Sequence, residues 1–258
     1  MITDLTDVIT RFYCNDEYIF KNPSLHTEDT EWKVNKIIPF INKWVACVGK
    51  KEISILDIGG GSGQILSGVS SYITTELGLQ VNKFALDLSP GMIRVQKENN
   101  PDLKKILNED VRRTSLKKKE IDLSLMIDVL EHVPFPNAAL KEVSRVSHFA
   151  LLKVPLEDCI LHKSLNLITG GKRKRTAINQ IGHINFYNFK TLKHDIEENM
   201  GQIMYYNFTN VAQYYAECAN LDAQRKAFYK VALCAYGISP VLCSHLFHDF
   251  AMFLVKCA

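Results

Sequence analysis

The run Ile-Ser-Ile-Leu-Asp-Ile-Gly-Gly-Gly-Ser-Gly at residues 53–63 decides the fold of this 258-residue chain. Its apolar first part predicts a buried strand that closes at Asp57, and Gln64 opens a predicted helix that extends to Leu77. Glycines between a strand and a helix let the backbone turn tightly and approach a ligand, while the helix N-terminus offers free N–H groups. The stretch therefore predicts a site for a nucleotide-type cofactor.

The spacing of the glycines discriminates between cofactors. A dinucleotide fingerprint, G-x-G-x-x-G counted from Gly59, would need a glycine at the position that Gln64 occupies. The glycines here alternate at Gly59, Gly61 and Gly63, and the first of them follows Asp57 by two residues. The spacing argues against an NAD-dependent oxidoreductase, which stays a less favoured alternative because it would share the sheet and a ribose-binding acid.

Acidic residues follow the next two predicted strands. Asp87 ends a strand that begins near Lys83, and Asp110 follows a shorter one. The carboxyl ends of parallel strands meet at one edge of a sheet, so both should lie near Asp57. Asp87 can accept hydrogen bonds from two ribose hydroxyls, and Asp110 can accept one from an adenine amine. The apolar residues expected to enclose the adenine are Leu88, Met92 and Val111.

The remaining pattern predicts a doubly wound α/β sheet. Further strands are expected at 121–130, 149–155, 202–208 and 250–256, with helical stretches between them. Ser89 suits an N-cap and Pro90 a first helical position. Residues 1–258 are expected to form one domain, made of an N-terminal helical segment (1–50), a cofactor-binding core (51–155) and an α-helical cap contributed by 156–189 and 211–248.

The N-terminal segment carries a helical stripe that includes Val34, Ile41 and Trp44. Thr30 is a candidate N-cap for this helix. Pro39 falls inside the stripe, so we expect a kink or a break there.

Residues 128–133, Asp-Val-Leu-Glu-His-Val, resemble the V-L-E-H-V signature of small-molecule methyltransferases related to the ubiquinone-biosynthesis O-methyltransferases. Residues 57–63 likewise resemble the E/D-x-G-x-G-x-G motif of class I S-adenosylmethionine (SAM)-dependent methyltransferases. Residues 182–192 are similar to a G-H-x-x-x-F/Y-x-x-x-x-L segment of these enzymes, and residues 22–33 to a histidine–acid–tryptophan segment. The resemblance is clearest over residues 50–155.

The resemblance implies a Rossmann-like sheet of seven mostly parallel strands. It also implies SAM as cofactor, S-adenosylhomocysteine as product, and methyl transfer to an oxygen or nitrogen of a small-molecule acceptor. The glycine turn would hold the amino-acid end of SAM, with Asp57 at its ammonium group. The expected cofactor-binding residues are Asp57, Gly59, Gly60, Gly61, Gly63, Asp87, Leu88, Met92, Asp110, Val111 and Asp128.

Two histidines are candidate general bases. The sulfonium of SAM is already a strong electrophile, so the protein must position an acceptor and, where needed, remove its proton. His132 and His183 could do this because imidazole titrates near neutral pH. His132 could instead form the pocket wall, and His183 could orient a loop. The expected acceptor-contacting residues are His162, His183 and Tyr187, and His26 is a weaker candidate.

A metal site is a less favoured alternative. Asp128, Glu131 and His132 are spaced i, i+3 and i+4, so they could converge if the segment turned helical. Some enzymes that this chain resembles use a divalent ion with acids and a histidine at this place.

Charge and composition limit the partners. The net charge is only +3, which predicts no strong nucleic-acid or membrane field. The basic run 172–175 is expected to be a solvated loop, with a phosphate or another anionic group of the acceptor as the alternative. The D/N-P-P-F/Y motif of enzymes that methylate base amines is absent at 127–130, so a nucleic-acid substrate is not expected.

The sequence also carries expectations about location. It has no eighteen-residue apolar stretch, no recognisable signal peptide, and seven scattered cysteines without a C-x-x-C pair. These features predict reduced thiols, no membrane span and a cytoplasmic protein. A non-catalytic protein that binds SAM or S-adenosylhomocysteine is the second alternative function. The sequence leaves the acceptor, the metal dependence and the oligomeric state open.

Overall fold

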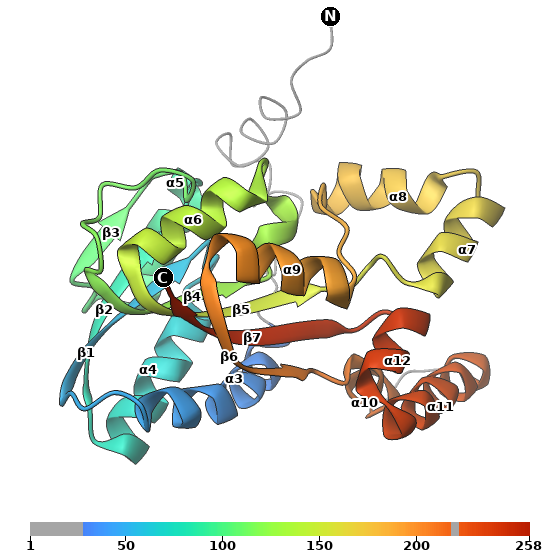
Figure 1. Ribbon diagram of the computed structural model, residues 1–258, viewed down its shortest axis with the longest axis horizontal. Coiled ribbons are helices and arrows are strands. Elements are labelled where there is room, and N and C mark those ends of the chain that lie inside the picture. Colours follow the sequence, from blue (N-terminus) through green and yellow to red (C-terminus); the bar gives the residue numbers. More distant parts are fainter. Residues whose placement is uncertain (1–27, 218–221) are drawn as a thin grey trace, which may run out of the picture.

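The computed structural model describes residues 28–217 and 222–258; His26 and most of the segment 22–33 lie outside these residues. Seven strands form one sheet (Figure 1). They are β1 (Glu52–Ile58), β2 (Gln80–Leu86), β3 (Lys105–Leu107), β4 (Ile121–Ile127), β5 (Ser147–Pro155), β6 (Gly201–Phe208) and β7 (Phe250–Cys257). Their order is β3-β2-β1-β4-β5-β7-β6, and β7 alone is antiparallel to its neighbours β5 and β6. The predicted fold class is confirmed.

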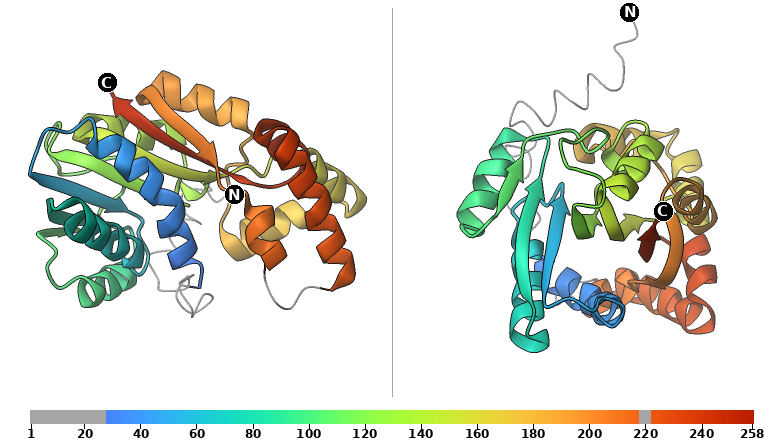
Figure 2. Two further views of the ribbon diagram at one scale, coloured as in Figure 1. Left: turned by 90° about the horizontal axis from the view of Figure 1, so that it is seen from below. Right: turned by 60° about the vertical axis from the view of Figure 1, so that its left-hand side comes forward.

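Helices cover both faces of the sheet (Figures 1 and 2). Their bounds are α3 (Thr30–Val45), α4 (Gln64–Leu77), α5 (Pro90–Asn99), α6 (Pro136–Val146) and α9 (Phe189–Asn199). One hydrophobic core joins α3 and α4 to the sheet, and a second joins α6 and α9 to its other face. All seven residues of β4 are buried, as a central strand of a covered sheet requires.

The strand order reverses between β1 and β4. The chain builds β1, β2 and β3 outward in one direction and then returns to place β4 on the other side of β1. Loops leave the carboxyl ends of these strands in opposite directions, which opens a crevice where α/β proteins bind ligands. The residues that follow β1, β2, β3 and β4 all reach this crevice.

Two groups of helices form the cap. The first follows β5 and contains α7 (Ile160–Ile168), α8 (Lys172–Thr176) and the π-helical turn η2 (Ala177–Ile181). The second lies between β6 and β7 and contains α10 (Val211–Glu217), α11 (Ala223–Ile238) and α12 (Pro240–Leu246). Figure 1 shows both groups beyond the same end of the sheet, on the right. No described helix combines the length and the apolar character needed to cross a membrane.

Three local predictions differ from the structure, and one is confirmed. Asp29, not Thr30, is the N-cap of α3, and α3 continues without a break through Pro39 because its buried face packs against α4. The basic run 172–175 is a short helix, α8, and not a loop. Ser89 does cap α5, since its side chain accepts a hydrogen bond from the Met92 N–H.

Candidate active site

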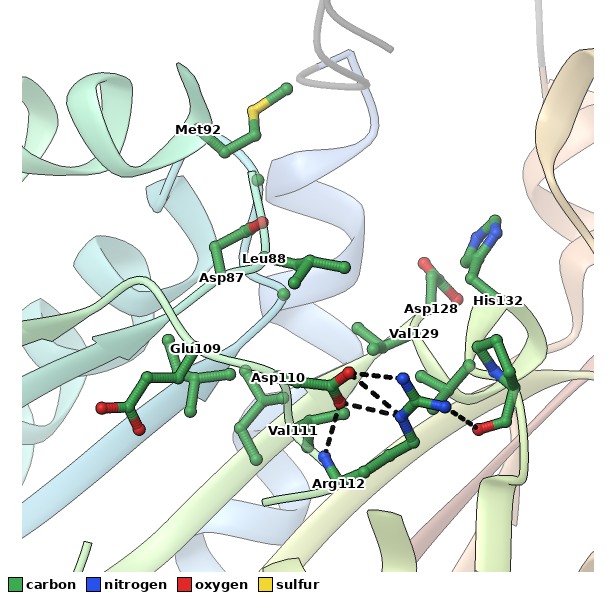
Figure 3. Close-up of a pocket in the computed structure, with 16 residues that line it drawn as sticks. Asp87, Leu88, Met92, Glu109, Asp110, Val111, Arg112, Asp128, Val129 and His132 are labelled. Atoms are coloured by element: carbon green, nitrogen blue, oxygen red, sulfur yellow. Dashed lines mark hydrogen bonds and ion pairs between the residues drawn. The ribbon is translucent and has the colours of Figure 1, made fainter. Parts of the chain in front are cut away.

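A cavity opens at the carboxyl ends of β1, β2, β3 and β4 (Figure 3). It lies at the reversal of strand order, where the fold predicts a ligand. Nine of the expected cofactor or catalytic residues line it: Gly59, Gly61, Asp87, Leu88, Met92, Asp110, Val111, Asp128 and His132. The other lining residues are Ile58, Leu86, Glu109, Arg112, Val129, Val133 and Pro134.

The glycine turn is shaped by the acid before it. Gly59, Gly61 and Gly63 have φ of +61°, +55° and +74°, which side chains other than glycine rarely adopt. A Cβ on Gly60 would lie 1.9 Å from Asp57 Oδ2, so the backbone can pass over this carboxyl only as glycine. Asp57 thus lies beneath the turn and not on the cavity wall.

Asp87 presents a buried carboxyl to the cavity. Oδ1 accepts a hydrogen bond from the Ser89 N–H at 2.9 Å, and Oδ2 lies 3.4 Å from Gln96 Nε2. Burial raises the pKa of Asp87 to about 6, although backbone N–H groups oppose the shift. Burial and the charge of Asp87 raise the pKa of Asp57 to about 7. A cationic ligand would favour the ionised form of both buried acids, so this side of the site suits positive charge.

Asp110 is held by an arginine that sequence reasoning did not single out. Arg112 donates to both carboxylate oxygens, with Nη2 to Oδ2 at 2.6 Å, and its backbone N–H reaches Oδ1 at 2.8 Å (Figure 3). Burial alone would raise the pKa of Asp110, but Arg112 keeps it below its ordinary value. The predicted hydrogen bond from an adenine amine would therefore share this carboxylate with Arg112, which the predicted role did not anticipate.

Asp128 is enclosed by two lysines. Lys153 of β5 reaches Oδ1, and Lys33 of α3 lies 3.1 Å from Oδ2. Burial would raise the pKa of Asp128, but the two charges bring it to about 2. Asp128 also has a positive φ of +57°, which turns the chain sharply after β4. The carboxylate thus ties α3 to the middle of the sheet beside the cavity.

His132 forms part of the cavity wall. Its Nδ1 lies 3.1 Å from the Gly182 carbonyl, and its ring meets the His183 ring edge-on with centroids 4.8 Å apart. Burial and the charge of His183 lower the pKa of His132 to about 4. An imidazole with such a low pKa is a poor proton acceptor. The low pKa and the position of His132 therefore favour a role in the cavity wall over a role as general base.

His183 has a carboxylate partner. Its Nδ1 lies 2.6 Å from Oε2 of Glu157, and the side chains are largely buried. Burial alone would lower the pKa of His183, but the hydrogen bond to Glu157 and the charge of Glu131 outweigh it and raise the pKa. Burial likewise opposes ionisation of Glu157, yet the contact with His183 brings its pKa to about 2. An ionised acid that orients an imidazole is the arrangement of a general base.

Glu157 was missed from the sequence, although a signal exists. It comes two residues after Pro155, the last residue of β5, just as the other site acids follow their strands. Arg173 of α8 also contacts it, with Nη2 3.3 Å from Oε1 and 2.8 Å from Nε2 of His162. The basic run therefore contributes one inward-facing cation to the network behind His183.

Several expected residues lie away from the cavity. Asp57, Gly60 and Gly63 build the turn without lining the cavity, and their contact with the cofactor stays a prediction. Tyr187 is 5% exposed in the hydrophobic core, so its ring packs against apolar side chains where an acceptor contact was expected. His162 borders a second cavity in the cap, lined by Glu157, Asp158, His162, Lys163, Asn166, Arg173, Lys174 and Phe186.

The structure changes which residues could bind a metal in the less favoured alternative. Asp128 does not fit, because both of its oxygens are paired with lysines. Glu131, His132 and His183 instead offer ligand atoms within 4.8 Å of one another, and Glu131 Oε2 is buried without a hydrogen-bond partner among the described residues. One carboxylate and two imidazoles suit a divalent transition metal better than Mg²⁺.

Comparison with known proteins finds a similarity to one family over the cofactor-binding core. Residues 56–148 match the family model described as a methyltransferase domain. This match spans the glycine turn, the acids after β2 and β3, and the segment 128–133. No curated protein sequence matches the chain.

Solved structures share the fold at low identity. Geranyl diphosphate C-methyltransferase from Streptomyces coelicolor A3(2), in complex with Mg²⁺, geranyl diphosphate and S-adenosylhomocysteine, is 10% identical with a TM-score of 0.57, and both chains are covered to 100%. Phosphoethanolamine N-methyltransferase 2 of Haemonchus contortus is 14% identical with a TM-score of 0.62, covering 100% of this chain and 61% of that one. A chain of the complex between the Haloferax volcanii Trm112 methyltransferase activator and a methyltransferase is 13% identical, with a TM-score of 0.57 and coverages of 100% and 98%.

Proposed function

We propose that this chain is a class I SAM-dependent methyltransferase, and we propose an acceptor class and a general base for it. SAM is the methyl donor. We place the adenosine of SAM in the cavity, between Asp87 and Asp110. The methionine end of SAM then lies at the turn of Gly59 and Gly61. The buried acids of this site suit a ligand that carries both a sulfonium and an ammonium charge.

The acceptor is a small molecule that is methylated on oxygen or nitrogen. Two of the similar structures hold a small molecule, geranyl diphosphate in one and phosphomonomethylethanolamine in the other. Their presence supports a small-molecule acceptor. The pair of Glu157 and His183 supports an acceptor oxygen or nitrogen, because a hydroxyl or amine group loses a proton when it is methylated. The acceptor enters under the cap and meets His183, whose ring lies against the cavity-lining His132.

His183 takes a proton from the hydroxyl or amine of the acceptor while that group attacks the methyl group of SAM. Glu157 fixes the imidazole through Nδ1, which leaves Nε2 to receive the proton, and stabilises the imidazolium that forms. The methyl–sulfur bond breaks as the new bond forms, and the sulfonium becomes the neutral thioether of S-adenosylhomocysteine. The observation that carries this proposal is the 2.6 Å Glu157–His183 contact beside the cofactor cavity.

Transfer of a labelled methyl group tests the proposed activity. The protein is incubated with methyl-labelled SAM and a panel of small molecules that carry phenolic hydroxyl, carboxyl or amine groups. A labelled small-molecule product is expected from at least one group of acceptors. Binding of SAM without any labelled product across the panel would instead favour the non-catalytic binding protein.

The proposed base predicts a pH profile. Only neutral His183 can accept a proton, and the pKa of His183 is raised from 6.5. The value of kcat/KM should therefore rise with pH and level off once the pH exceeds the pKa of His183. Glu157→Gln removes the carboxylate that raises this pKa. The inflection should therefore move to lower pH, and the plateau should fall because the imidazolium loses its partner.

Glu198→Gln is the matched control, because Glu198 is an exposed acid on α9. It should reproduce the wild-type profile in plateau and inflection. An inflection that stays in place in Glu157→Gln would show that His183 is not the group that titrates.

Metal removal separates the base from the metal alternative. The contact between His183 and Glu157 suits a general base and also a metal ligand, since a metal-binding histidine commonly donates its other N–H to a carboxylate. A metal held by Glu131, His132 and His183 would supply Lewis-acid activation of the acceptor. We expect methyl transfer to persist in excess chelator, because His183 and Glu157 suffice. Loss of activity that a divalent ion restores would contradict the base assignment.

A further inference from the structure

The two most exposed large apolar side chains among the described residues are neighbours at the end of α7. Leu167 is 84% exposed and Ile168 is 80% exposed. Ile160 and Leu165 on the same helix are also exposed, and α7 contributes no buried residue. An apolar cluster on a protein surface marks an interaction site when a binding partner can cover it.

A run of cations follows this apolar tip in the chain. After the turn 169–171, α8 supplies four consecutive basic residues. Arg173 points inward to Glu157 and His162, as described above. In the parts of the chain that the structure describes, no carboxylate pairs with Lys172, Lys174 or Arg175. The net charge of +3 hides this local concentration of uncompensated positive charge.

The tip lies at the outer end of the cap. Figure 1 shows α7 and α8 beyond the end of the sheet, with the turn that joins them directed away from the core. The helix α12 packs against α7 and adds two further exposed apolar side chains, Val241 and Leu242. The part of the cap next to α7 thus carries further exposed apolar side chains.

We propose that this docking surface, made of Leu167, Ile168, Lys172, Lys174 and Arg175, binds the surface of an anionic lipid membrane. A bilayer offers negative headgroups and apolar chains within one interfacial layer, which matches cations placed beside exposed aliphatic side chains. Nucleic acid would satisfy the cations only, since Leu167 and Ile168 cannot stack on bases. A short apolar tip also inserts without any membrane-spanning helix.

Vesicle co-sedimentation of the full chain tests the proposal. Wild type should bind vesicles that contain phosphatidylserine, and binding should fall about ten-fold with phosphatidylcholine alone or in high salt. Leu167→Asp/Ile168→Asp should lower binding at least as strongly. Lys172→Glu/Arg175→Glu should lower it by a similar factor, since each reversed charge now opposes the surface.

Two variants are matched controls. Met204→Asp places one carboxylate at an exposed apolar residue of β6. Lys117→Glu/Lys118→Glu reverses two exposed lysines just before β4 begins, at the opposite end of the sheet from the cap. Both should bind vesicles like wild type. Affinity for S-adenosylhomocysteine should be unchanged in every variant, which verifies folding and keeps this test separate from the methyl-transfer proposal. Absence of wild-type binding, or equal binding by all variants, would overturn the docking surface.

Discussion

Asp87→Ala should weaken the binding of S-adenosylhomocysteine by roughly 10²–10⁴-fold. An ionised carboxylate that accepts two hydrogen bonds from the ribose contributes about 1.5–3 kcal/mol through each. Neither Asp110 nor Asp57 replaces it, because Asp110 is paired with Arg112 and Asp57 lies beneath the turn. Isothermal titration calorimetry measures the loss directly.

Asp87 also accepts a hydrogen bond from the Ser89 N–H, so its removal could disturb the start of α5. Asp87→Asn keeps an oxygen for that N–H and removes the charge, and it should still bind at least ten-fold more weakly than wild type. Asp102→Asn changes an acid that forms a surface ion pair with Lys83 and should bind normally. Tight binding by Asp87→Asn would remove Asp87 from the proposed ribose contact.

His183→Ala should lower kcat for a hydroxyl acceptor by roughly 10²–10⁴-fold, the usual contribution of a positioned general base. The affinity for S-adenosylhomocysteine should change by less than about three-fold, because His183 does not line the cofactor cavity. Single-turnover rates with saturating SAM separate the methyl-transfer step from product release.

His194→Ala is the control, since His194 is an exposed histidine on α9. It should leave both constants unchanged. His132→Ala should instead weaken cofactor binding more than it slows transfer, as expected of a cavity-wall residue. Wild-type turnover by His183→Ala would exclude proton removal at this residue.

The part of the site that could be predicted from the sequence depends on local order. Strand ends carry Asp87 and Asp110, and a parallel sheet brings its strand ends to one edge, so no knowledge of long-range packing was needed. The start of α5 followed in the same way from Ser89 and Pro90. The same reasoning extends to Glu157, which also follows a strand.

The rest of the site depends on residues that are distant in the chain. Lys33 and Asp128 are paired only because α3 packs across the sheet, and Glu157 meets His183 only because η2 brings the chain back. Nothing in the spacing of these residues encodes such contacts. Pro39 shows the same limit for local structure, because tertiary packing keeps α3 continuous where propensity predicts a break.

The central claim is that the edge of the sheet binds an adenosyl sulfonium cofactor, and a comparison of melting temperatures tests it most directly. The chain is melted alone, with S-adenosylhomocysteine and with NAD. At about 100 times its dissociation constant, a ligand adds roughly 2.7 kcal/mol to the free energy of unfolding, which is a shift of several degrees for a chain of this size. We predict a shift with S-adenosylhomocysteine that Asp87→Ala abolishes, and none with NAD. A shift with NAD alone would contradict the assignment of the cofactor.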